Sequence, residues 1–316
     1  MAHNKKILQT ALNWTLVIAA WGYLIYKLVT YDNYAALTEQ FRHAGTYEWL
    51  CLIVSFCLFP VNRLLEAWKW QYLVRHIEPM GILEAQRQVY FGAVAGFITP
   101  YKLGEYPART LLFHHTQQNW LSAVVLGLIG GYAMTTVIVL LGLPSAVKSV
   151  SNIDLSTSIG ATLLLAAALL IGLPWVMNRL SKRTWKNQKT QLLVQQLGRL
   201  NAADIIMVLF ISLLRYACFL LQLWLCMRFC SIELSAGDWL NSLLLYYLLI
   251  TVTPSVPLAE VAVRGSWAIA VFGVYGKQVT AAATIAAILL WFINTIPPVI
   301  IGGLIKTPSS EQHKNN

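Results

Sequence analysis

The sequence predicts an all-α polytopic membrane protein with about six spanning helices and two re-entrant or broken segments in an inverted repeat. Three observations lead to this fold class: a very apolar composition, a series of apolar stretches of spanning length, and a charged motif that occurs twice. Of the 316 residues, 57% are hydrophobic and only 11% are charged, with a mean hydropathy of +0.59. A soluble domain carries about 25% charged residues, so most of this surface is expected to face lipid.

A spanning helix needs about 20 largely apolar residues, and the chain contains six such stretches. They are residues 11–30, 47–68, 119–142, 155–177, 202–227 and 279–305. The first is interpreted as a retained span because no small-residue cleavage site follows it. Residues 1–305 are expected to form a single membrane domain with repeat halves at about 47–142 and 202–305. Residues 306–316 are expected to be a polar, disordered tail.

The basic residues predict the orientation of the chain. Residues 178–201 hold six lysines and arginines and no acid, so this segment is expected to be cytoplasmic, together with both termini of a protein in the cell (inner) membrane. Its last part places Leu193, Val194, Leu197 and Leu200 on one helical face, which suits a helix lying on the membrane surface. The net charge of +10 is therefore attributed to cytoplasmic loops and anionic headgroups, and not to nucleic-acid binding.

Two further apolar stretches are too short to cross alone and end in a shared motif. Residues 99–109 read TPYKLGEYPAR, and residues 253–264 read TPSVPLAEVAVR. Each has Thr-Pro, four or five residues, and then Glu-x-x-x-Arg, with the glutamates and the arginines each 155 positions apart. Pro100 and Pro254 are expected to interrupt helices because proline has no N–H donor. The loop charges thread the two segments in from opposite sides, as in inverted-repeat transporters.

The charges in these two segments predict a transport site. An unpaired charge in hydrocarbon costs at least about 3 kcal/mol, so each motif is expected to bind a ligand or to neutralise itself. In the first case the two arginines hold an anionic headgroup alternately from the two sides, while the glutamates orient them. In the second case each glutamate only neutralises the arginine four positions later and pins a loop. The candidate substrate-binding residues are Glu105, Arg109, Glu260, Arg264, Arg215, Lys102, Pro100 and Pro254.

Three weaker signals accompany the motif. Arg215 lies in the middle of an apolar stretch and is expected to pair with a motif glutamate or to face the cavity. The end of the second stretch is interpreted as a cytoplasmic interface anchor. Its residues are Pro60, Asn62, Arg63, Glu66, Trp68 and Trp70. Gly92, Gly96 and Gly104 are expected to let backbones approach closely.

No catalytic residue, metal site or cofactor is predicted. The five cysteines form no CxxC pair, and the six histidines show no HExxH or comparable spacing. The expected ligands are membrane lipids with anionic headgroups. Whether the chain forms a homo-oligomer or binds a lipid-synthase partner is left open.

The order of these motifs resembles a known family. A span ending near NRLLEAWKW precedes GxxxGxxTPxxxGExxxR, and TPxxPxAExxxR follows late in the chain. This order resembles the membrane domain of the lysylphosphatidylglycerol synthase/flippase family, over about residues 10–305. The resemblance implies a flippase or transporter that moves an anionic or modified phospholipid, or a lipid-linked headgroup, between leaflets. It also implies that Glu105, Arg109, Glu260 and Arg264 line central cavities.

The chain departs from the family pattern in two ways. Val256, Leu258 and Ala259 stand where the family usually has glycines. The soluble aminoacyl-transferring domain of full-length members is expected to be absent, so lipid synthesis is not expected. The alternatives to a transporter are an intramembrane lipid-modifying transferase and a non-transporting scaffold for an envelope-lipid synthase.

Overall fold

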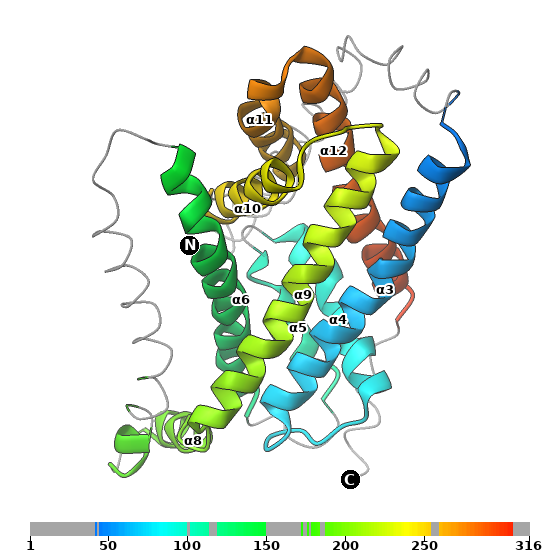
Figure 1. Ribbon diagram of the computed structural model, residues 1–316. Coiled ribbons are helices and arrows are strands. Elements are labelled where there is room, and N and C mark those ends of the chain that lie inside the picture. Colours follow the sequence, from blue (N-terminus) through cyan, green and yellow to red (C-terminus); the bar gives the residue numbers. More distant parts are fainter. Residues whose placement is uncertain are drawn as a thin grey trace, which may run out of the picture.

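The structure is a computed structural model that describes residues 44–99, 102–113, 119–149, 178–183, 187–253 and 259–305, together with residues 42, 172 and 176. Every regular element in these residues is a helix (Figure 1), which confirms the predicted all-α class. The elements are α3 (Thr46–Val74), α4 (Ile82–Ile98), α5 (Glu105–Thr110), α6 (Trp120–Ser149), α8 (Gln188–Leu197), α9 (Ala202–Phe229), α10 (Ala236–Val252), α11 (Glu260–Phe272), η3 (Gly273–Tyr275) and α12 (Lys277–Gly303).

Several predictions fall on residues outside these ranges. The expected span at 11–30 does, and so does the span at 155–177 apart from residues 172 and 176. Pro100, Pro254 and the tail 306–316 also lie outside the described residues.

Four of the described helices, α3, α6, α9 and α12, are long and apolar enough to cross a membrane. They correspond to four of the six expected stretches. Two of them are clearly longer than expected, because α3 continues to Val74 beyond residue 68 and α6 continues to Ser149 beyond residue 142. Glu66 and Trp70 of α3 lie in the interior of the helix bundle, where their exposed fractions are 2% and 1%. The interpretation of Glu66 as an interface residue is therefore wrong.

The order of helices in residues 46–149 recurs in residues 202–303. A long helix is followed by a shorter one, a break, another short helix, and a second long helix. The first residues of equivalent helices lie 156, 154, 155 and 157 positions apart, at Thr46 and Ala202, Ile82 and Ala236, Glu105 and Glu260, and Trp120 and Lys277.

The two leading helices, α3 and α9, pack side by side in opposite directions (Figure 1). Ser55 and Gln222 exchange hydrogen bonds near one end of the pair. Arg215 donates to Asn62 Oδ1 at 3.0 Å near the middle of the pair. At the other end, the Tyr72 hydroxyl donates to Asp204 at 2.8 Å. Polar contacts thus hold α3 against α9 along most of their length.

The two broken segments begin in the same way. Thr99 and Thr253 are the C-caps of α4 and α10, and both have extended backbone. In each, the threonine hydroxyl donates to the carbonyl oxygen four residues earlier at 2.7 Å. A proline follows each threonine in the sequence, and the residue before proline avoids the helical region. Thr-Pro therefore ends both helices, and a new helix starts at Glu105 and at Glu260.

The predicted amphipathic helix is present as α8. Val194, Leu197 and Leu200 are buried, and the last two belong to an apolar cluster with side chains of α3, α4 and α6. The apolar face of α8 is thus covered by protein and not left free for a membrane surface. This packing also places residues 187–200 at the same end of the bundle as the end of α3.

Candidate functional site

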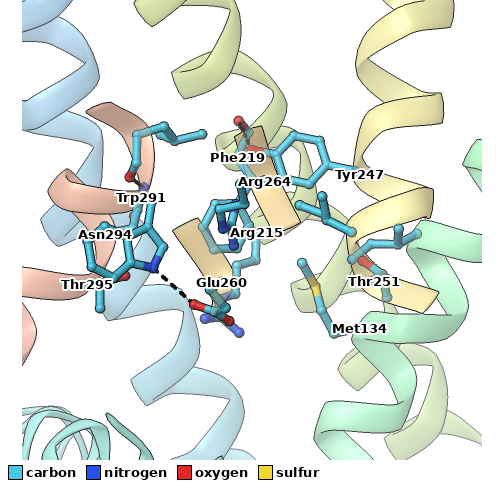
Figure 2. A pocket seen from close by; sticks show the side chains of 13 residues that line it. Met134, Arg215, Phe219, Tyr247, Thr251, Glu260, Arg264, Trp291, Asn294 and Thr295 are labelled. Atoms are coloured by element: carbon cyan, nitrogen blue, oxygen red, sulfur yellow. Dashed lines mark hydrogen bonds between the residues drawn. The ribbon is translucent and has the colours of Figure 1, made fainter. Parts of the chain in front are cut away.

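A cavity of about 510 Å³ lies between the two broken segments. A smaller part of about 240 Å³ adjoins it and shares Arg215, Glu260 and Arg264 with it (Figure 2). Volumes of this size are typical of small-ligand sites. The charged side chains that line the larger cavity come from α3, α5, α9 and α11 and from the turn before α5. They are Arg63, Glu66, Lys102, Glu105, Arg215, Glu260 and Arg264.

Glu66 is the centre of the first group of charges. One of its carboxylate oxygens, Oε2, lies 3.0 Å from Lys69 Nζ and 2.5 Å from Arg215 Nη1. Its other oxygen lies 2.9 Å from Arg109 Nη2. A single buried carboxylate therefore ties together α3, α5 and α9. Arg215 lines the cavity as expected, but its partner is Glu66 and neither of the motif glutamates.

Arg109 lies outside the cavity lining and is held by buried contacts. Its side chain is fully buried and lies 2.5 Å from the carboxylate of Glu105 in addition to Glu66. The guanidinium carbon also lies 4.8 Å and 5.1 Å from the ring centres of Tyr106 and Trp70. Arginine over an aromatic face gains a further cation–π attraction. The predicted pair of Glu105 and Arg109 exists, but Arg109 is not among the lining residues of the cavity.

Close packing against α4 keeps Arg109 in this position. A methyl group at Gly92 would lie 2.7 Å from Arg109 Cγ and 2.7 Å from the Glu105 carbonyl oxygen, and one at Gly96 would lie 3.2 Å from Glu105 Cβ. The expected close approach at Gly92 and Gly96 is therefore confirmed.

Gly92→Ala is expected to lower the free energy of unfolding by about 1–3 kcal/mol, the usual cost of overpacking. The Glu105 backbone oxygen cannot rotate away, so α5 must move from α4. The measurement is the thermal unfolding midpoint of the purified protein in detergent. Gly237→Ala is the matched control, because nothing lies within 4 Å of a Cβ at that position. Equal midpoints for the two variants would contradict this tight packing.

The second motif is paired differently from the first. Glu260 accepts from Trp291 Nε1 at 3.1 Å (Figure 2) and forms an ion pair with Lys102 Nζ at 2.9 Å. The expected pair of Glu260 and Arg264 is not among the ion pairs of the described residues. Lys102 belongs to the turn before α5 and has a left-handed backbone, with φ of 58°. The ion pair of Lys102 and Glu260 therefore connects the two broken segments directly.

Arg264 and Arg63 are the two cavity arginines that no carboxylate of the described residues pairs with. Arg264 lines both parts of the cavity, and its Nε atom is buried without a hydrogen-bond partner. The Nε atom of Arg63 is likewise buried and without a partner. Both side chains therefore line the cavity, and each has a buried Nε–H group without a hydrogen-bond partner.

Arg63 donates to a backbone carbonyl of α12 that has no hydrogen-bond donor within its own helix. Pro297 and Pro298 lie inside this helix, and neither can donate to the carbonyl four residues earlier. The carbonyl of Asn294 is one of the two that lose their helical partner. Arg63 Nη2 donates to this oxygen at 2.5 Å, which places the arginine at the cavity between α3 and α12.

The structure adds residues that the sequence interpretation missed as site residues: Arg63, Glu66, Lys69 and Asn294. A signal for three of them was present, because Arg63, Glu66 and Lys69 recur at three-residue spacing, which puts them on one helical face. The expected end of the stretch at residue 68 put Lys69 outside the helix and put Arg63 and Glu66 near a membrane interface, so the shared face was not interpreted as part of a site.

Comparisons with known proteins agree with this architecture. The chain matches the family model described as the lysylphosphatidylglycerol synthase TM region over residues 7–303. Comparison with curated proteins and with solved structures gave no match. The matched residues include all the described helices and both broken segments. The chain is a multi-pass membrane protein that belongs to the family of the lysylphosphatidylglycerol synthase transmembrane region.

Proposed function

We propose that the protein moves a phospholipid with an anionic or modified headgroup, or a lipid-linked headgroup, between the leaflets of the cell membrane. The observation that carries this proposal is the charge of the central cavity. Three carboxylates and six cations lie in or against it, so the site has a surplus of positive charge. The carboxylates are Glu66, Glu105 and Glu260, and the cations are Arg63, Lys69, Lys102, Arg109, Arg215 and Arg264.

A surplus of buried positive charge in a membrane is costly unless an anion compensates it. Arginine suits a phosphate ligand because its planar group donates two parallel hydrogen bonds and stays charged when buried. Arg264 is the arginine best placed for this role, since it lines the cavity and no carboxylate of the described residues pairs with it.

The proposal includes an inverted repeat. The recurring helix order and the opposite directions of α3 and α9 support two halves related by a pseudo-two-fold axis in the membrane plane. In this scheme the cytoplasm lies at the end of the bundle that holds α8. The ion pair of Lys102 and Glu260 connects the halves across the cavity, and it must break when the halves separate on one side.

The test is a proteoliposome assay with the purified chain and a fluorescent anionic phospholipid. Movement of the lipid between leaflets, measured as the fraction of label accessible to an impermeant quencher, is expected to exceed that of protein-free vesicles severalfold. Recovery of a chemically altered lipid would instead identify a lipid-modifying transferase. Unmoved and unaltered lipid would contradict the proposal and favour a scaffold.

A further inference from the structure

The charges around the cavity differ in how well they are paired. Every carboxylate of the cavity is already paired: Glu66 with three cations, Glu105 with Arg109, and Glu260 with Lys102. A ligand therefore cannot gain much from the cations that these acids hold. The remaining cations, Arg63 and Arg264, are the ones that no carboxylate in the described part of the chain neutralises.

The two arginines approach one cavity from opposite halves of the chain. Arg63 belongs to α3 and Arg264 to α11, and both line the larger cavity. Asn294, whose carbonyl oxygen accepts from Arg63, lines the same cavity and its smaller part together with Arg264. Both arginines therefore line one cavity that Asn294 of α12 also lines.

Two arginines need a ligand with about two negative charges and enough terminal oxygens to accept from both guanidinium groups. A phosphodiester has one negative charge and two non-bridging oxygens, which satisfy a single guanidinium fork. A phosphate monoester carries a charge of about −1.5 to −2 near pH 7 and three terminal oxygens, and a diphosphate offers still more. Only these can neutralise both arginines. An aminoacylated headgroup with a net positive charge would add to the surplus.

We infer that the cavity selects a headgroup with a phosphate monoester or a diphosphate, held between Arg63 and Arg264, over a phosphodiester headgroup. This inference rests on the proposed function, since it names the headgroup class of the transported lipid. The site is a phosphate clamp with one arginine from each half.

The experiment measures binding and not transport, so the two proposals can fail separately. Purified full-length protein in neutral detergent is titrated with phosphatidic acid, a phosphate monoester, or with phosphatidylglycerol, a phosphodiester, in mixed micelles. Phosphatidic acid is expected to bind about tenfold more tightly at pH 7.5, because a second arginine gains a charge-assisted contact. The preference should shrink at pH 5.5, since the second ionisation of the monoester has a pKa of about 6.

Two variants test the clamp. Arg63→Gln and Arg264→Gln are each expected to reduce the binding of phosphatidic acid to that of phosphatidylglycerol. The double variant keeps neither guanidinium fork and is expected to bind both lipids more weakly than either single variant. Arg199→Gln is the control, because it removes a positive charge from an exposed position outside the cavity. A further arm uses soluble pyrophosphate alone. Binding of pyrophosphate as tight as that of phosphatidic acid would support the clamp and assign it to a soluble phosphate.

Equal binding of the two lipids at pH 7.5, or a preference that survives both arginine variants, would overturn the inference. If phosphatidic acid is preferred but no lipid crosses vesicle membranes, the clamp stands and the transport proposal fails. If lipid crosses without any preference for the monoester, the transport proposal stands and the clamp fails.

Discussion

Glu66→Gln is expected to abolish most of the folded protein, the largest stability effect of any single substitution in the cavity wall. The carboxylate of Glu66 pairs with Lys69, Arg109 and Arg215. Removing its charge leaves Lys69 and Arg215 without an acid and Arg109 with only Glu105. Breaking a buried ion pair by removing one partner costs about 3–5 kcal/mol, which is a large part of the stability of a typical domain.

The measurement for Glu66→Gln is the yield of monodisperse protein in detergent and its thermal unfolding midpoint. The matched control is Glu233→Gln, whose side chain is 84% exposed and lies 3.8 Å from Arg228. Combining Glu66→Gln with Lys69→Met removes one of the stranded cations and is expected to recover part of the lost midpoint. A Glu66→Gln protein as stable as the Glu233→Gln control would show that the central carboxylate is not needed for folding.

Arg264→Gln is expected to keep the fold and to lose lipid movement by about tenfold or more, whereas Arg109→Gln is expected to lose the fold itself. Removing a buried, hydrogen-bonded charge that contacts a ligand typically costs about 2–5 kcal/mol of binding. Arg109 is enclosed by two carboxylates and two aromatic rings. Arg264 has no carboxylate partner among the described residues and lines the cavity.

Initial rates of lipid movement in proteoliposomes, divided by the amount of reconstituted protein, measure this difference. Arg264→Lys keeps the charge but loses the planar fork, so its rate should lie between those of the parent and Arg264→Gln. The outcome that would sink this distinction is a folded Arg109→Gln protein with the same transport defect as Arg264→Gln. That result would restore the expectation that the two arginines hold the headgroup alternately.

The breaks in the two short helix pairs could be predicted because their cause is local. Thr99 and Thr253 each precede a proline, and the proline restricts the backbone whatever surrounds it. The pair of Glu105 and Arg109 was also accessible, since the two residues are four positions apart in one helix. The all-α membrane class followed from the apolar composition and from apolar stretches of spanning length.

The partners of Glu66 and Glu260 could not be predicted in this way. Glu66 meets Arg109 and Arg215 across 43 and 149 residues of sequence. Glu260 forms an ion pair with Lys102, which belongs to the other half of the chain. Such pairs depend on which helices pack together, and the same spacing of Glu and Arg in the two motifs therefore led to two different outcomes. By the offset of 156 positions between α3 and α9, the position equivalent to Glu66 is Gln222, so the second half has no carboxylate there.

The two prolines of α12 also give this helix a mechanical property. A helix bends most easily where its backbone hydrogen bonds are missing, and Pro297 and Pro298 place that point of low bending stiffness at the level of the cavity. Arg63 stiffens it by occupying the carbonyl of Asn294. An anion that drew Arg63 away would remove this contact, so we expect occupancy of the cavity to change the bending stiffness of α12 at this point.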